Sequence, residues 1–266
     1  MQTTKIRKTS RLEGLARSPQ TSRRPGKILV AGPIVRPCPL GSALQWFCVV
    51  VGLPLALLVG IPIACANWVA FRSPSKILFR QRRTGHNGVE FSILKFRTMR
   101  EPRGSNIESW ASAGDRARVT RLGRLLRNSH LDELPQLINV LRGEMRLIGP
   151  RPEMVEIEAW ASESIPHFGS RLTLAPGITG LAQVVQGYTG RSLEAYAEKR
   201  DLALAYQEHR SLRLDLWILW RTTLTMLRLE GWNGNEHLNG TLTDRAARGR
   251  AIPHPLVEKL ALNERC

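Results

Sequence analysis

The sequence of 266 residues has few cysteines, an excess of basic over acidic residues and no internal repeat. Its four cysteines are Cys38, Cys48, Cys65 and Cys266, which lie far apart and form no C-x-x-C pair. This pattern indicates neither a disulfide framework nor a zinc site, and it is typical of a reducing compartment. The sequence also lacks a finger, zipper or aromatic–basic RNA motif, so we expect no nucleic acid among its partners.

Only 22 Asp and Glu residues stand against 39 Lys and Arg residues, which gives a formal net charge of +17. Such a charge favours an anionic partner but does not by itself choose among nucleic acid, an anionic membrane and a phosphorylated ligand. Residues 1–42 are basic and rich in Ser, Thr, Pro and Gly, so they are predicted to form a disordered basic tail. The tail is either a solvated extension or an arm on anionic lipid, where each cation contributes roughly 1 kcal/mol.

Residues 43–71, "ALQWFCVVVGLPLALLVGIPIACANWVAF", contain no charged side chain. A straight helix of this length would reach about 43 Å, more than the ~30 Å of a bilayer's hydrocarbon core, although a buried soluble helix is the alternative. Pro54 and Pro62 are expected to interrupt the helix, and basic residues flank both of its ends. Because positive flanks stay on the cytoplasmic side, we predict a re-entrant membrane helix. A signal peptide is rejected because the apolar run and the leader before it are too long.

The expected fold class is α+β and predominantly helical, with a compact cytoplasmic domain at residues 72–232, for which the motifs described below imply a catalytic role. Residues 73–99 predict a small β-hairpin around the turn sequence "TGHNG". A helix is expected from residue 132 to about 142, and "LAQVVQ" reads as a short strand between glycine-rich turns. Two amphipathic helices at 193–210 and 212–232 close the domain, and the tryptophans of the second favour the membrane interface over the core. Residues 233–266 are predicted to form a polar C-terminal tail.

Asp132 and Glu133 are adjacent acids at the start of the predicted helix, and Pro135 fits its first turn. One interpretation is structural, with Asp132 capping the helix and Glu133 complementing its dipole. The other depends on Arg127 and Arg151, which lie on either side in sequence and whose planar forks suit phosphate. Two acids beside arginines could hold Mg²⁺ together with a diphosphate and supply a carboxylate nucleophile.

Five motifs in order extend this pattern along residues 43–232. They are "FRQRRTG" at 79–85, "KFRTM" at 95–99, "RVTRLGRLLRNSHLDELPQLINVLRGEMRLIGPRPE" at 118–153, "PGITGLAQV" at 176–184 and "DLALAYQEHRSLRLDLWIL" at 201–219. Together, behind an apolar segment, they resemble the bacterial sugar transferase family, the small monotopic phosphoglycosyl transferases.

The resemblance implies that a sugar 1-phosphate moves from a UDP-sugar to undecaprenyl phosphate with release of UMP. It also implies Mg²⁺ and a covalent phosphosugar intermediate on Asp132, with Glu133 as a metal partner or an acid/base. Both acids are therefore the expected metal ligands. The basic residues assigned to the substrate are Arg127 and Arg151 for phosphate, and Lys95 and Arg97 for the site wall. The expected location is the cytoplasmic face of the bacterial inner membrane, with membrane lipids as further partners.

The sequence departs from the family pattern at two places. The apolar segment has no Ser-Pro hinge, so Pro54 and Pro62 compete for that role, and the distance to Gln81 favours Pro62. His130 stands where a hydroxyl or apolar residue is commoner, and we expect it on the surface or at a cap.

A second hypothesis is a membrane-anchored basic binding module without catalysis, which explains the charge but leaves the acid pair unexplained. The sequence does not determine the sugar, the polymer or whether the chain forms a homodimer. Residues 183–200 and the loop at 100–115 are the expected selective regions.

Overall fold

The computed structural model describes residues 39–101, 115–187, 190 and 192–228. The predicted tails therefore lie almost entirely outside the described residues, as does most of the loop at 100–115. The helices are α1 (Pro39–Phe71), α2 (Asp115–Arg118), α3 (Arg121–Asn128), α4 (Gln136–Leu141), α5 (Val155–Ser164), α6 (Leu181–Val185), α7 (Leu193–Glu208) and α8 (Leu212–Arg228). The strands are β1 (Leu78–Thr84), β2 (Glu90–Phe96), β3 (Arg146–Ile148) and β4 (Gly177–Thr179). Four 3₁₀ turns join them: η1 (Pro74–Lys76), η2 (His86–Gly88), η3 (Leu131–Glu133) and η4 (Phe168–Thr173). The fold is α+β and mostly helical, as predicted.

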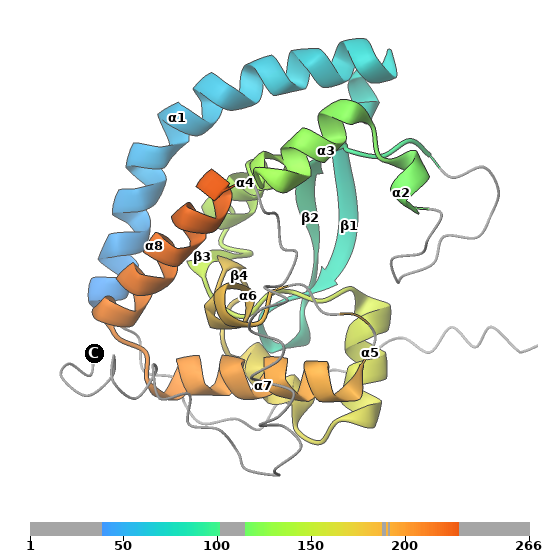
Figure 1. The fold of residues 1–266 in the computed structure, drawn as a ribbon. Helices are drawn as coiled ribbons and strands as arrows, with labels where there is room; N and C mark the ends of the chain where they lie inside the picture. The colour runs from blue at the N-terminus through green and yellow to red at the C-terminus, as the bar shows by residue number, and fades with distance from the viewer. Residues whose placement is uncertain (1–38, 102–114, 188–189, 191, 229–266) are drawn as a thin grey trace, which may run out of the picture.

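Helix α1 is continuous through Pro54 and Pro62, so the expected interruption at the prolines is wrong. It bends instead, and it arches over one side of the molecule (Figure 1). A proline removes one backbone donor, and the helix can absorb this loss by bending while neighbouring hydrogen bonds persist. At the end of the arch, the Asn67 Nδ2 group donates to the carbonyl oxygens of Ile77 and Arg97, each at 3.1 Å.

The two faces of α1 differ sharply in burial. Its inner face is represented by Val49, which packs with Ile93 of β2. The outer face is apolar and exposed: Leu58 is 71% and Val69 is 76% accessible. By length and composition the helix could cross a membrane. Large exposed apolar patches mark protein or membrane contacts, but the re-entrant path stays a prediction.

The predicted hairpin is confirmed. Strands β1 and β2 pair antiparallel from Leu78↔Phe96 to Thr84↔Glu90. The turn between them has two residues with left-handed backbone, Asn87 at φ 52° and Gly88 at φ 77°. Asparagine and glycine are the residues that tolerate this conformation best, which explains why the turn forms here.

Two element predictions are wrong in detail. The acid pair lies on the 3₁₀ turn η3, and α4 starts only at Gln136, with Pro135 in the capping position. The segment "LAQVVQ" forms helix α6, and the strand is the preceding β4, which pairs parallel with β3. A short apolar run fits a strand and a buried helix equally well, so periodicity could not separate them.

The C-terminal helices form as predicted and build the largest apolar cluster. Leu202 of α7 and Leu214 and Ile218 of α8 pack there with Ile148 of β3. Trp217 of α8 packs against this cluster, whereas Trp220 is exposed, so the expected interfacial position of α8 stays a prediction.

Candidate active site

The acid pair is placed by a tight turn between α3 and α4. His130 adopts a left-handed backbone with φ 57° and directs the chain from the end of α3 into η3. Asp132 and Glu133 are each only 7% accessible. His130 occupies the N-cap position of η3, which confirms the expected position at a cap, but it is equally buried, so the surface alternative is wrong.

Glu133 is neutralised by two cations from distant parts of the chain. Its Oε1 atom accepts from Lys95 Nζ of β2 at 2.6 Å and from Arg151 Nη2 at 2.9 Å. Burial alone would raise the pKa of Glu133, but Arg151 and Lys95 outweigh it and hold the pKa far below its usual range. Glu133 therefore stays ionised at neutral pH, which argues against an acid/base role.

Asp132 has the opposite electrostatic environment. Burial raises its pKa to about 6, since Lys95, Arg127 and Arg151 offset the desolvation only in part and Glu133 adds to it. Adjacent acids with separated pKa values can serve different functions in one site. As a carboxylate, Asp132 is the less stabilised of the two.

The predicted basic residues do not all meet the acid pair. Lys95 and Arg151 do, and Arg127 acts on Asp132 through its charge while its Nε donates to Thr98 Oγ1 at 2.9 Å. Arg97 instead donates to the carbonyl oxygen of Lys76 and lies 3.8 Å from Glu101. The placement of Arg97 in the site wall thus has no contact to support it among the described residues.

Sequence reasoning missed a buried ionic layer behind Arg151. Arg171 of η4 donates from Nη1 to the Arg151 carbonyl oxygen at 3.2 Å, and it forms an ion pair with Glu158 of α5. Both Arg171 and Glu158 are almost completely buried. Beside them, Lys199 Nζ of α7 contacts Glu153 Oε1 at 2.9 Å. Glu153 closes the quoted "GPRPE" motif, whereas Arg171 and Glu158 carry no local signal.

The carboxylates fit magnesium only in part. In the described part of the chain, no three His, Cys, Asp or Glu side chains are grouped as a metal site. Asp132 and Glu133 offer hard oxygen donors, but Glu133 already pairs with two cations. Mg²⁺ often binds one or two carboxylates together with substrate phosphates. The donor set is compatible with an ion that shares a bound diphosphate, and Asp132 and Glu133 as its ligands stay a prediction.

Comparison with known proteins identifies the family of this chain. The family model described as "Bacterial sugar transferase" matches residues 40–229. The chain therefore belongs to the bacterial sugar transferase family, which confirms the resemblance drawn from the motifs.

Three relatives illustrate the similarity. The chain is 40% identical over 181 residues to the UDP-glucose:undecaprenyl-phosphate glucose-1-phosphate transferase of Caulobacter vibrioides, covering 67% of both chains. It is 35% identical over 202 residues to the exopolysaccharide production protein ExoY of Rhizobium meliloti, covering 69% of this chain and 85% of that protein. It is 37% identical over 179 residues to the UDP-N-acetylgalactosamine-undecaprenyl-phosphate N-acetylgalactosaminephosphotransferase of Aeromonas hydrophila, covering 65% of this chain but only 42% of that protein.

Proposed function

We propose that this protein transfers a sugar 1-phosphate from a UDP-sugar to undecaprenyl phosphate and thereby starts the assembly of a bacterial polysaccharide. The observation that carries the proposal is that the two adjacent acids have different electrostatic environments. Glu133 is fixed by Lys95 and Arg151, whereas Asp132 is buried beside the same cations and forms no ion pair with any residue that the structure describes. The names of the relatives from Caulobacter and Aeromonas supply the substrate classes.

The reaction follows in two displacements. A carboxylate oxygen of Asp132 attacks the phosphorus that carries the sugar, the bond between the two phosphates breaks, and UMP leaves with that bridging oxygen. A phosphate oxygen of undecaprenyl phosphate then attacks the same phosphorus and releases the Asp132 carboxylate. Arg151 and Arg127 are positioned to balance the charge of the diphosphate, and Lys95 and Glu133 orient the site. When bound, Mg²⁺ would screen the repulsion between the carboxylate and the phosphates.

We further propose that α1 inserts into the bacterial inner membrane from its cytoplasmic face. Its exposed apolar side and the basic residues near both ends support this placement. Both ends of α1 pack on the same domain: Gln45 lies beside β3, and Asn67 bonds to the backbone of Arg97. A helix that enters and returns on one side satisfies this arrangement, with Pro62 or Pro54 as its bend.

The proposal is tested with membranes containing the full chain, radiolabelled undecaprenyl phosphate and a panel of UDP-sugars that includes UDP-glucose and UDP-N-acetylgalactosamine. We expect one donor to give labelled lipid-linked sugar and stoichiometric UMP. EDTA should abolish both signals, and added Mg²⁺ should restore them, since the charged donor needs a counterion at this site. Turnover that is unchanged in EDTA would contradict the metal assignment. Salt-sensitive DNA binding without any turnover would favour the binding-module hypothesis instead.

The raised pKa of Asp132 predicts an acid limb in the pH profile of kcat/KM. The carboxylate must be ionised to attack, so activity should be half-maximal near pH 6, the pKa of about 6 that burial gives this group. One pH unit lower, about one-tenth of the activity should remain. Lys95→Gln should move the limb to higher pH, because Lys95 is the strongest charge favouring ionised Asp132. A profile that stays flat down to pH 4.5 would contradict Asp132 as the nucleophile.

A further inference from the structure

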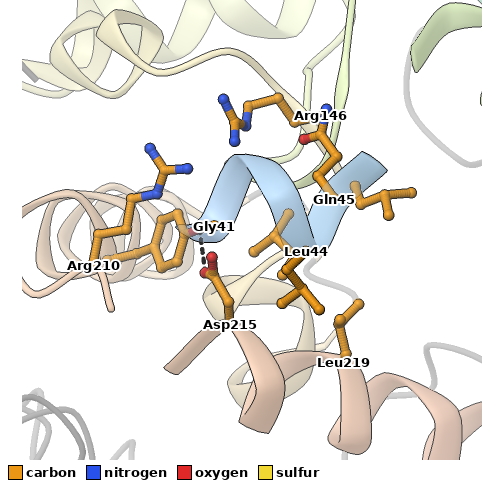
Figure 2. A pocket seen from close by; sticks show the side chains of 10 residues that line it. Gly41, Leu44, Gln45, Arg146, Arg210, Asp215 and Leu219 are labelled. Carbon is orange, nitrogen blue, oxygen red and sulfur yellow. Dashed lines mark hydrogen bonds between the residues drawn. The ribbon is translucent and has the colours of Figure 1, made fainter. Parts of the chain in front are cut away.

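A second cluster of basic residues lies apart from the acid pair, at a hollow beside the first turns of α1. Figure 2 shows Arg146 and Arg210 reaching toward each other above the turn that contains Gly41. Arg146 comes from β3, and Arg210 lies between α7 and α8. Part of the lining is apolar and includes Leu44 of α1 and Leu219 of α8. None of the residues lining this hollow belongs to the cluster around Asp132.

The charge of this hollow is not balanced. Within the described residues, no carboxylate lies within ion-pair distance of Arg146 or Arg210, although Arg146 Nη2 contacts Ser42 Oγ at 3.4 Å. The Nε atom of Arg210 is buried without a hydrogen-bond partner among those residues. Burial and the neighbouring Arg210 both lower the pKa of Arg146, as expected for two cations that face each other. An unsatisfied buried donor of this kind calls for an unseen partner.

Asp215 is the carboxylate that lines this hollow, and it is hydrogen-bonded to Tyr206, which lines it too. Its Oδ1 atom accepts a hydrogen bond from Tyr206 Oη at 2.7 Å, shown as a dashed line in Figure 2. Burial raises the pKa of Asp215, and the Tyr206 hydrogen bond and the charges of Arg210 and Arg146 offset this only in part. Two guanidinium groups share this single carboxylate, which leaves a net positive charge for an anion, and the arginine fork suits phosphate.

Exposed apolar side chains lie one or two residues along α1 and α8 from residues that line the hollow. Leu40 and Phe47 belong to α1, and Leu216 and Trp220 belong to α8; all four are exposed. Helix α8 runs beside the first half of α1 (Figure 1). A ligand with a phosphate headgroup and hydrocarbon chains would match this surface. Its phosphate would bind the two arginines, and its hydrocarbon chains would lie against the exposed apolar side chains.

We propose that this hollow binds the headgroup phosphate of an anionic bilayer phospholipid whose acyl chains lie along α1 and α8. A bilayer lipid fits better than the acceptor, since an acceptor phosphate must reach Asp132 and the two clusters share no residue. Binding there would fix the depth at which the start of α1 sits in the membrane. The inference rests on the proposed membrane insertion of α1.

The test uses the full chain purified in detergent and titrated with phosphatidylglycerol or phosphatidylcholine of identical acyl chains, with bound lipid counted by native mass spectrometry. Wild-type protein should retain phosphatidylglycerol in preference to phosphatidylcholine. Arg146→Gln/Arg210→Gln should lower its affinity for phosphatidylglycerol about 30-fold, roughly fivefold for each cation near an anionic lipid. The matched control is Arg142→Gln/Arg213→Gln, which removes two exposed arginines and should change nothing.

Equal retention of phosphatidylglycerol by the two double variants would overturn the proposal. So would preferential displacement of phosphatidylglycerol by undecaprenyl phosphate, which would make the hollow an acceptor site. If circular dichroism shows that Arg146→Gln/Arg210→Gln is unfolded, the wild-type comparison decides, and no preference over phosphatidylcholine rejects the site. Flotation with vesicles separates the two hypotheses: if α1 does not insert, wild-type protein itself fails to float, whereas a failed lipid site leaves flotation intact.

Discussion

Asp132→Asn is expected to abolish the release of UMP from a UDP-sugar while the protein still folds and remains in the membrane fraction. An amide has no anionic oxygen to attack phosphorus, so no phosphosugar intermediate forms. Loss of an enzymatic nucleophile typically lowers kcat by about 10⁴-fold or more. The measurement is UMP release from the donor identified in the panel, at matched protein levels. Asp201→Asn is the matched control, because Asp201 is an exposed acid paired with Arg200 at the surface.

The same variant should be more stable than wild type above pH 6. Folded Asp132 holds its proton up to about pH 6, whereas the unfolded chain releases it near the ordinary value of 3.8. A raised pKa in the folded state means that this group's contribution to stability falls as the pH rises through that window. Asparagine carries no such penalty, so the gain in melting temperature should be larger at pH 8 than at pH 5. Retained turnover, or a variant that melts below wild type at pH 8, would count against the assigned role.

Arg171→Met is expected to lower the free energy of unfolding by about 3–5 kcal/mol, the usual cost of leaving one member of a buried ion pair without its partner. Arg171 and Glu158 are 1% and 2% accessible, so water cannot compensate the remaining carboxylate. The Arg151 carbonyl oxygen also loses its donor, so activity should fall in the folded fraction as well. Chemical denaturation followed by circular dichroism measures the change in stability.

The surface pair of Arg200 and Asp201 provides the control for this prediction. Arg200→Met should cost clearly less than Arg171→Met, because Arg200 is only partly buried and its partner Asp201 is exposed, although the variant also loses the hydrogen bond to the Pro166 carbonyl oxygen. The double variant Arg171→Met/Glu158→Gln should recover part of the loss, since it no longer buries an unpaired charge. If Arg171→Met unfolds at the same denaturant concentration as Arg200→Met, the buried pair has no structural importance.

Local patterns were sufficient for much of this fold. The apolar run of α1 and the turn at Asn87 and Gly88 depend on the chemistry of neighbouring residues, and both elements form where they were expected. The acid pair and Arg151 were identifiable because short motifs carry them. Local patterns failed at α6, where a run of five residues was compatible with two structures, and at the prolines, where α1 bends and continues although an interruption was expected.

The sequence by itself determined which acids and arginines this protein has available, and the order in which its apolar and turn segments follow one another. Only the tertiary structure decided which of these acids and basic residues lie close enough to interact. It brings Lys95 from the hairpin and Arg151 from beyond β3 onto Glu133, leaves Asp132 with a raised pKa, and places Arg171 behind Arg151. The reason is physical: desolvation and Coulomb interactions depend on distances in space, and residues 38 positions apart in sequence, such as Lys95 and Glu133, carry no local sign that they will meet.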